Sequence, residues 1–312
     1  MYNNQKNKTL IFFSTHIINE MIVSEYKKLL NIDGYDVIFA IENSDGKFSK
    51  DFENPIQEFE FFGEKYKCFL YNENIHKSLN LPYYTGGKEN DTFKNNMWYN
   101  GDYRFYYVKK IFPQYDFYWQ VEYDIFCNGE SYKPFLDKYV NNKADLIIQH
   151  KDRKIEPETK NWYWIDKTDW IYKGQKLHRS FYPLCRLSSK AINFLYQRRM
   201  EHDKIYSALE DKKINRWIMC ELFTATELIN NGYTHEYFDE YFYYTPEYDL
   251  TTTRIFENPD NRLYHPVKGN FLERLKNLEK ENKELKQQVI ALSHYTISFL
   301  GIKINLKNNI QK

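Results

Sequence analysis

The 312-residue chain lacks the short motifs that mark several common classes of enzyme and binding protein. Its four cysteines are far apart and form no CxxC pair, which argues against a zinc module and against a disulfide framework. It has no glycine-rich Walker-type phosphate loop and no GxSxG elbow, so P-loop NTPases and α/β-hydrolases lose support. Basic residues do not gather into an aromatic-interleaved patch within residues 1–265, which disfavours nucleic acid as a partner.

Long apolar runs are also missing. Residues 1–8 are polar and the apolar run 9–13 is short, so we predict no signal peptide and expect the protein to face the cytoplasm. Residues 295–304 are apolar but too few to cross a bilayer. Because Lys303 and Lys307 accompany them, we expect that this end can rest on an anionic membrane surface, at the inner face of the membrane.

Aromatic residues are abundant. With 28% charged and 42% hydrophobic residues the composition is that of a folded protein, and 19% of the residues are aromatic. Sugar rings stack their C–H faces on aromatic rings, so one hypothesis is an acceptor groove lined by Trp162, Trp164, Trp170 and Tyr172. The alternative is that the richness in Tyr, Asn, Lys and Ile reflects an AT-rich genome.

The first 45 residues predict a strand, a helix and a second strand. Residues 9–13 form a short apolar run, apolar positions continue with helical spacing to Leu30, and 36–41 is a second apolar run after Gly34. This order is typical of a parallel βαβ unit. A nucleotide would sit above the polar residues that follow the two strands, which are Ser14, Thr15, His16 and Asp45.

The same alternation continues along the chain. Further strands are expected at 66–71, 115–121 and 144–148, and helices at 102–112, 131–140, 189–199 and 217–230. We therefore predict an α/β protein with a GT-A or Rossmann-like, mostly parallel central sheet flanked by helices, followed by a C-terminal amphipathic helix. The predicted domains are a catalytic domain at 1–268 and a helical oligomerisation or membrane-surface segment at 269–312.

The tripeptide Glu122-Tyr123-Asp124 closes the aromatic run 115–121. Side chains alternate along a strand, so Glu122 and Asp124 leave its carboxyl end on the same side. Open α/β sheets bind ligands at this edge, where two carboxylates would hold a divalent cation that in turn holds a diphosphate. The alternative for such a pair is a solvated strand end.

These features together resemble a GT-A type glycosyltransferase. The resemblance is carried by the amino-terminal unit, by the Glu-x-Asp (ExD) variant of the Asp-x-Asp element, by the helix with Glu221 and by Tyr264-His265-Pro266-Val267-Lys268. Segment 115–132 also looks like the Trp-x-x-Glu-x-Asp core of a family of uncharacterised proteins known mainly from fungi. The resemblance implies Mn²⁺ or Mg²⁺ held by Glu122, Asp124 and His265, and a phosphate contact from Lys268.

The implied reaction moves a sugar from a nucleotide-sugar donor to a glycan or lipid-linked acceptor, as in bacterial polysaccharide or lipooligosaccharide biosynthesis. Glu221 is the predicted catalytic base; Glu227, on another face of its helix, is the alternative, and an inverting or a retaining outcome stays open. Asp102 and Arg104 are candidate ribose and phosphate contacts. Two other functions remain open: a nucleotidyltransferase or related metal-dependent phosphate-transfer enzyme, and a non-catalytic coiled-coil scaffold.

The tail differs from the body in charge and pattern. Residues 266–312 hold nine Lys/Arg and four Glu, which leaves 35 basic and 39 acidic residues for 1–265. Apolar residues between 271 and 292 recur in steps of four and three, with Asn282 at one inner position, which is typical of a short heptad pattern. This pattern predicts either a parallel homodimer or a helix that packs on residues 1–265 of the same chain.

Overall fold

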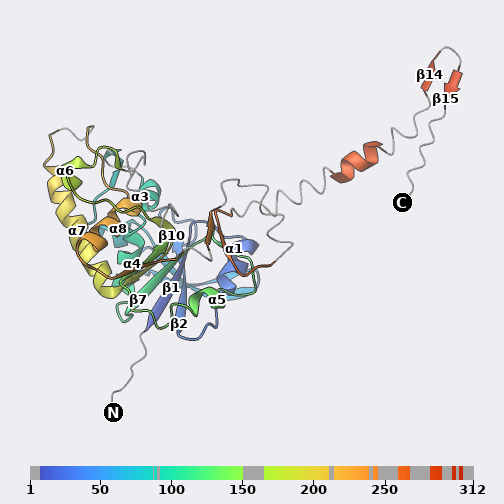
Figure 1. The fold of residues 1–312 in the computed structure, drawn as a ribbon. Coiled ribbons are helices and arrows are strands. Elements are labelled where there is room, and N and C mark those ends of the chain that lie inside the picture. The colour runs from blue at the N-terminus through green and yellow to red at the C-terminus, as the bar shows by residue number, and fades with distance from the viewer. Residues whose placement is uncertain are drawn as a thin grey trace. The chain divides into compact units, whose positions relative to one another are not determined.

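The computed structural model describes residues 8–86, 88–89, 92–149, 165–210, 214–238, 242–244, 259–267, 282–289, 297–299 and 302–304. By its internal contacts the chain divides into two units, Met1–Val267 (unit 1) and Lys268–Lys312 (unit 2). Figure 1 shows the fold and labels its elements. The division lies next to the predicted boundary, while the functions predicted for the two parts stay predictions.

An eight-stranded sheet forms the centre of unit 1, in the order β11-β9-β10-β7-β1-β2-β4-β3. The strands are β1 (Thr9–Thr15), β2 (Tyr35–Glu42), β3 (Ile56–Phe61), β4 (Glu64–Tyr71), β7 (Phe117–Glu122), β9 (Leu146–Gln149), β10 (Phe181–Ser188) and β11 (His235–Tyr237). The neighbours β7, β1, β2 and β4 run parallel, whereas β10 is antiparallel to both of its neighbours and β3 to β4. The predicted α/β class with a mostly parallel central sheet is confirmed.

Helices cover both faces of this sheet (Figure 1). The helices of unit 1 are α1 (Glu20–Lys27), α2 (Glu73–Lys77), α3 (Phe93–Tyr99), α4 (Tyr103–Ile111), α5 (Lys133–Leu136), α6 (Asp169–Tyr172), α7 (Ser189–Ser207) and α8 (Cys220–Asn230). On β1, Leu10 and Phe12 pack with α4, α7 and α8, while Ile11 and Phe13 pack with α1 and α5. This alternation produces two separate apolar layers, one on each face of the sheet.

Several element ends have local causes that are visible in the sequence. The Asn19 side chain accepts a hydrogen bond from Ile22 N and caps α1, and Ser188 caps α7 in the same way through Ala191 N. Helix α8 ends at Asn230, and Gly232 follows with a φ of 75°, a conformation that glycine adopts without steric cost. The predicted helices at 189–199 and 217–230 are thus confirmed, although α7 continues to Ser207 and α8 starts only at Cys220.

Smaller sheets lie outside the central one. The strands β8 (Phe126–Cys127), β12 (Phe242–Tyr244) and β13 (Leu263–His265) make a three-stranded sheet with β13 in the middle, and β5 (Tyr84–Thr85) pairs with β6 (Lys88–Glu89). Strand β8 follows β7 after a short turn, so its pairing with β13 brings the end of unit 1 back to the carboxyl end of β7. This second sheet positions the candidate site.

Unit 2 contains a helical segment at 282–289 and a hairpin of β14 (Ile297–Phe299) and β15 (Ile302–Ile304). Leu285 and Val289, which occupy inner positions of the predicted heptad pattern, are each 56% exposed. Most of the 271–292 pattern lies outside the described residues, so dimerisation stays a prediction. Within the described part of the chain no helix has the length and apolar character needed to cross a membrane.

Candidate metal and donor site

The carboxyl end of β7 carries the two acidic residues of the Glu-x-Asp element. Glu122 is the last residue of β7 and pairs in register with Ser14 of β1. The ladder continues one residue further, because Tyr123 N donates to Ser14 O over 2.9 Å. The chain then turns, with Ile125 N donating to Glu122 O over 3.0 Å, and Asp124 lies within this turn.

Strand β13 brings His265 to the same turn. Its residues Leu263 and Tyr264 pair with Cys127 and Phe126 of β8, and Val267 N donates to Asp124 O over 2.7 Å. His265 Nε2 therefore lies 3.3 Å from Asp124 Oδ1, although the two residues are far apart in the sequence. The ring of Phe181, at the start of β10, packs edge-on against the imidazole with centroids 5.0 Å apart.

Glu122, Asp124 and His265 each offer one ligand atom, and these atoms all lie within 4.8 Å of one another. We call these three residues and Arg104 the edge cluster. Asp124 Oδ1 is buried and accepts no hydrogen bond from the part of the chain that the structure describes. A buried carboxylate oxygen without a donor is costly unless a cation completes its environment. Two carboxylates and one imidazole are a donor set that suits Mn²⁺ or Mg²⁺, so these residues fit the predicted cation.

Arg104 closes the cluster on the side of α4. Its guanidinium makes an ion pair with Glu122 through Nη1, and Nη2 donates to Met97 O over 3.3 Å. Burial alone would lower the pKa of Arg104, but the adjacent Glu122 carboxylate, with the hydroxyl of Tyr71 nearby, raises it above its ordinary value. Arg104 is thus a permanent positive charge within contact distance of one candidate metal ligand.

His16 follows β1 directly and lies beside the turn. Its half-buried ring packs edge-on against Tyr123, with ring centroids 4.8 Å apart. Burial, together with the positive charges of Lys94 and Arg104, lowers the pKa of His16 against the opposing effect of Glu42 and Asp124. The imidazole is therefore neutral at pH 7 and can accept or donate one hydrogen bond toward a ligand.

The other residues expected to face a nucleotide lie at the same edge of the sheet. Ser14 Oγ is buried and lies 3.0 Å from the hydroxyl of Tyr71. Thr15 Oγ1 closes a local turn with the backbone of Ile17, since it donates to Ile17 O and accepts from Ile17 N. Asp45 is exposed after β2 and accepts from Lys47 N over 2.9 Å.

Asp102 requires a correction. We expected it to bind a ribose, but it is fully buried, and Arg199 Nε and Nη2 each donate to one of its carboxylate oxygens over 2.8 Å. The hydroxyl of Tyr106 donates to the same carboxylate over 2.7 Å. Burying an unpaired charge costs far more than burying a hydrogen-bonded pair, so Asp102 serves to neutralise Arg199 inside the unit and is not part of the donor site.

The two candidate bases on α8 differ in their surroundings. Glu227 accepts from Tyr172 Oη over 2.9 Å, pairs with His202 Nε2 over 3.0 Å, and accepts from Arg198 Nε over 2.8 Å. Burial would raise the pKa of Glu227, but the hydrogen bonds from His202 and Arg198 lower it to about 2. We call these four residues the inner cluster. A carboxylate held in this way is a poor proton acceptor, which disfavours Glu227 as the base.

Glu221 is buried in the first turn of α8. Its backbone oxygen accepts from Ser180 Oγ over 2.5 Å, and Ser180 precedes the Phe181 that packs on His265. Glu221 is therefore attached to the segment that supports the edge cluster. Its predicted role as base stays a prediction.

Two other expectations fall partly or wholly outside the described residues. Lys268, the predicted phosphate contact, lies outside them, as do Trp162 and Trp164 of the predicted aromatic groove. Trp170 and Tyr172 are described. Trp170 is half-buried, stacks on Trp217 and donates from Nε1 to Arg216 O over 2.8 Å, and Tyr172 is buried against Glu227.

No family model and no curated protein matches the chain. Among solved structures, the chain is similar to a glycosyltransferase involved in the glycosylation of the major capsid of PBCV-1. The two share 11% identity, the match covers 88% of this chain and 99% of that chain, and the TM-score is 0.37. At this score the likeness adds nothing to what the strand order and the edge cluster show.

Sequence reasoning missed two residues near the edge cluster. Gln120 lies two positions before Glu122 on the same face of β7, and its Nε2 is 3.4 Å from Glu122 Oε1. The strand alternation that identified Glu122 also indicates Gln120. Lys94 acts on His16 from α3, in a stretch for which the sequence predicted no helix, although Thr92 caps it by accepting from Asn95 N.

Proposed function

We propose that the protein is a metal-dependent glycosyltransferase that moves a sugar from a nucleoside-diphosphate sugar to a hydroxyl group of a glycan or lipid-linked acceptor. The observation that carries the proposal is the convergence of Glu122, Asp124 and His265 within 4.8 Å, with a buried Asp124 oxygen that lacks a donor among the described residues. They converge at the carboxyl edge of parallel strands, where open α/β sheets bind nucleotides.

In this proposal each residue of the edge cluster has a defined task. Asp124 Oδ1, a Glu122 oxygen and His265 hold Mn²⁺ or Mg²⁺, which when bound neutralises the charge on the departing nucleoside diphosphate. Arg104 orients Glu122 and adds a fixed positive charge beside the diphosphate. Ser14, Thr15, His16 and Asp45 border the space for the nucleoside, and Lys268 is the proposed further phosphate contact.

Glu221 is the proposed base, which takes the proton from the acceptor hydroxyl as the new bond to the sugar forms. Its attachment to Ser180, one residue before the Phe181 that packs on His265, supports this role. Glu227 is not available for it, because Arg198, His202 and Tyr172 already occupy its carboxylate. The proposed acceptor is a bacterial surface polysaccharide or lipooligosaccharide.

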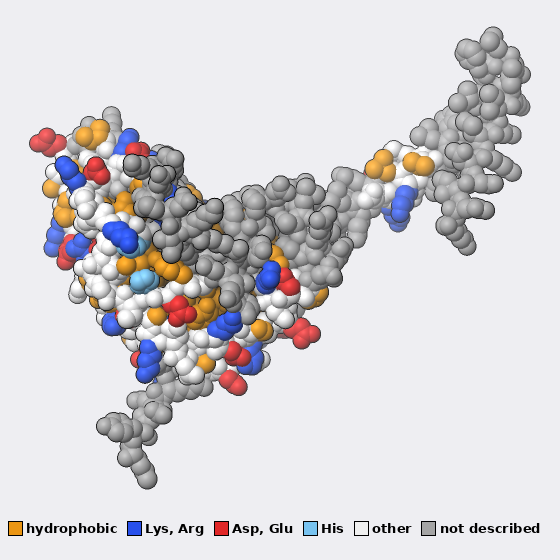
Figure 2. Space-filling model, in the orientation of Figure 1, with side chains coloured by type: hydrophobic (Ala, Val, Ile, Leu, Met, Phe, Trp, Pro, Cys, Tyr) orange, Lys and Arg blue, Asp and Glu red, His pale blue; other side chains and the backbone are white. Residues whose placement is uncertain are grey.

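The tail has a proposed role in reaching that acceptor. Its surplus of basic residues would attract residues 266–312 to an anionic inner membrane face, and the heptad pattern at 271–292 would pair two copies. The exposed Leu285 and Val289 support such pairing. On the face of unit 1 that Figure 2 presents, basic and acidic side chains are interspersed.

The test is a thermal-shift titration of the full chain with a panel of nucleoside diphosphates and sugar nucleotides, each with and without Mn²⁺. We expect one diphosphate to raise the Tm only when Mn²⁺ is present, and Asp124→Asn to abolish this rise without lowering the Tm of the free protein. Asp137→Asn, which removes an exposed carboxylate paired with Lys133, is the control.

The product that is released distinguishes the proposed glycosyltransferase from a nucleotidyltransferase. Incubation of the stabilising sugar nucleotide with the protein should release a nucleoside diphosphate, whereas a nucleotidyltransferase would release pyrophosphate from a nucleoside triphosphate. Absence of any Mn²⁺-dependent shift across the panel would overturn the proposal and favour the scaffold function.

A further inference from the structure

Helix α3 presents two exposed side chains on one face. Lys94 and Trp98 are four positions apart, so they lie one turn from each other on the same side of the helix. Lys94 is exposed and Trp98 is 62% exposed, whereas Phe93, Met97 and Tyr99 are buried. The indole of Trp98 is thus largely exposed, whereas both of its chain neighbours are buried.

The end of α3 is fixed in place around Trp98. On one side Met97 O accepts from Arg104 Nη2 over 3.3 Å. On the other side the hydroxyl of Tyr99 donates to Trp217 O over 2.7 Å, and Asn100 Oδ1 accepts from Trp217 Nε1 over 2.9 Å. These hydrogen bonds hold the backbone on both sides of Trp98, so the point at which its side chain leaves the helix is fixed.

This face of α3 adjoins the edge cluster. The arginine that binds Met97 O is the one that pairs with Glu122. Lys94 lies near enough to His16, the residue that follows β1, for its charge to lower the pKa of that imidazole. Gly101 packs closely on Cys220, since a Cβ there would lie 3.3 Å from the Cys220 sulfur, and Cys220 precedes the proposed base Glu221.

We propose that Trp98 and Lys94 form the acceptor subsite, in which the indole stacks on the C–H face of an acceptor sugar ring and the Lys94 ammonium donates to its hydroxyl or acidic groups. This inference rests on the proposed function. A sugar ring matches both side chains, because it has an apolar face for the indole and polar groups at its rim for the ammonium. A ring stacked here is held next to the segment that carries Glu221, as proton removal from its hydroxyl requires.

The acceptor sugar is favoured over the donor sugar as the ligand of this subsite because Trp98 is far more exposed than the metal ligands. The donor sugar must lie against the metal ligands, and the side chains of Asp124 and His265 are only 9% and 11% exposed. Trp98 is 62% exposed and so lies where a second substrate arrives from solvent. Of the aromatic residues predicted to line a groove at 162–172, the described Trp170 and Tyr172 bond to Arg216 O and to Glu227.

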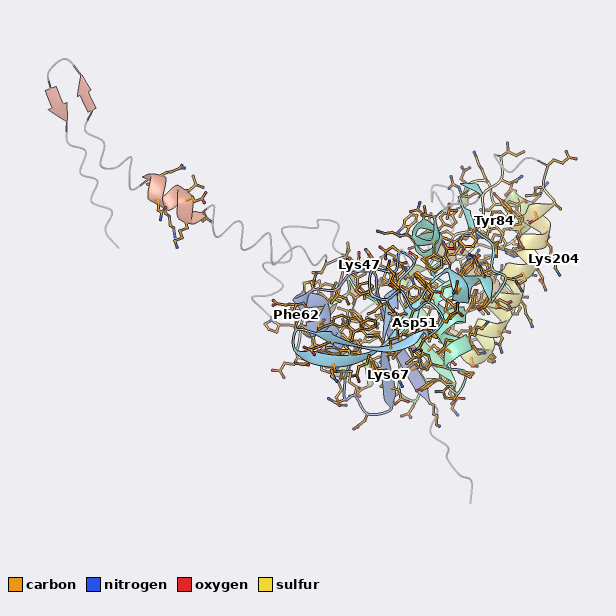
Figure 3. The ribbon with its side chains drawn as sticks, turned by 180° about the vertical axis from the view of Figure 1, so that it is seen from behind. Lys47, Asp51, Phe62, Lys67, Tyr84 and Lys204 are labelled. Atoms are coloured by element: carbon orange, nitrogen blue, oxygen red, sulfur yellow. The ribbon has the colours of Figure 1, made fainter. Side chains whose placement is uncertain are left out.

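Saturation-transfer NMR on the full chain tests the subsite, with Mn²⁺ and the stabilising nucleoside diphosphate present. The probes are methyl glycosides of glucose, galactose, mannose and N-acetylglucosamine. The control variant is Phe62→Ala, because Phe62 is 58% exposed and lies across the unit from Tyr84, whose backbone oxygen binds Asn100 at the end of α3. Figure 3 shows Phe62 and Tyr84 at opposite ends of unit 1.

At least one glycoside should give saturation transfer with wild type and with Phe62→Ala. The signal should fall about tenfold in Trp98→Ala and recover in part in Trp98→Phe, while the Mn²⁺-dependent nucleotide shift of both variants matches wild type. Equal glycoside signals in Trp98→Ala and wild type, or no signal for any glycoside with wild type, would overturn the subsite. Loss of the nucleotide shift in Trp98→Ala would also overturn it, because the indole would then contact the donor. Failure of the proposed function is distinct, since wild type itself would then show no nucleotide shift.

Discussion

The edge cluster and the inner cluster use the same kinds of side chain in different ways. Both combine carboxylate, imidazole and guanidinium groups inside unit 1. In the inner cluster both oxygens of Glu227 are occupied, by Tyr172 and His202 on one side and by Arg198 on the other. In the edge cluster Asp124 Oδ1 has only the imidazole of His265 at 3.3 Å and accepts no hydrogen bond from any described residue.

This difference indicates which cluster stabilises the fold and which binds a ligand. A buried carboxylate whose partners are all supplied by the chain contributes to folding, and removing it leaves its partners charged and unpaired. Asp124, whose Oδ1 accepts no hydrogen bond from the described residues, is the carboxylate that we propose to bind a cation. Stability should therefore depend on the inner cluster, and ligand binding on the edge cluster.

The largest expected effect is on stability. Glu227→Gln leaves Arg198 without its buried partner and should lower the free energy of unfolding by about 3–5 kcal/mol, as measured by urea denaturation. Glu201→Gln is the matched control, since Glu201 pairs with the same arginine but is 53% exposed, and it should cost less than about 1 kcal/mol. Equal losses in the two variants would contradict the difference between the clusters.

The next effect is on turnover. Asp124→Asn keeps the shape of the side chain but removes the charge that would hold the cation, so Mn²⁺-dependent release of nucleoside diphosphate from the donor should fall about a hundredfold or more. The free energy of unfolding should change by less than about 1 kcal/mol, because Asp124 has no hydrogen-bonded partner among the described side chains to lose. If Asp124→Asn unfolds as readily as Glu227→Gln, the edge cluster is structural.

The free energy of unfolding should fall at low pH because of the inner cluster. The pKa of Glu227 lies at about 2, below its ordinary value of 4.5, because His202 and Arg198 stabilise the charged form against the cost of burial. The stability that this shift contributes is complete above pH 4.5 and is lost as the pH falls toward 2, with a slope of up to about 1.4 kcal/mol per pH unit. Unfolding free energies measured between pH 5 and 2.5 should show a steeper loss in wild type than in Glu227→Gln. The same pH dependence in wild type and in Glu227→Gln would contradict a lowered pKa for Glu227.

The smallest effect concerns the arginine of the edge cluster. Arg104→Lys keeps the charge but loses the planar group that contacts both Glu122 and Met97 O, so the Mn²⁺-dependent affinity for the nucleoside diphosphate should fall about tenfold. Isothermal titration calorimetry measures this affinity. Unchanged affinity would show that Arg104 does not contribute to binding of the nucleoside diphosphate.

The sequence predicted the elements that follow from local rules. The apolar runs predicted the strands β1, β2 and β7 and the parallel pairing of β1 with β2, and the alternation along β7 identified Glu122. Ser188 and Gly232 mark a helix start and a helix end within a few residues of the chain, which makes such boundaries accessible from the sequence.

Features that depend on distant partners were not predictable in this way. Asp102 was predicted to bind a ribose, and only the fold shows that Arg199, 97 positions later, occupies both of its oxygens. Strand β10 gave no sign that it runs antiparallel between β7 and β9, since both directions have the same apolar pattern. The neighbours of Trp98 bond to Trp217 and Arg104, which are distant or on another helix. The spacing of residues in the sequence does not reveal these contacts.

The most direct test of the edge cluster is Mn²⁺ binding without any nucleotide, followed by electron paramagnetic resonance of the free ion. Wild type, Asp124→Asn, His265→Gln and the control Asp137→Asn should be titrated side by side. The account predicts one bound Mn²⁺ in wild type and in Asp137→Asn, and at least about tenfold weaker binding in each of the other two variants. Equal binding in all four proteins, or none in wild type, would contradict the claim that Glu122, Asp124 and His265 form a metal site.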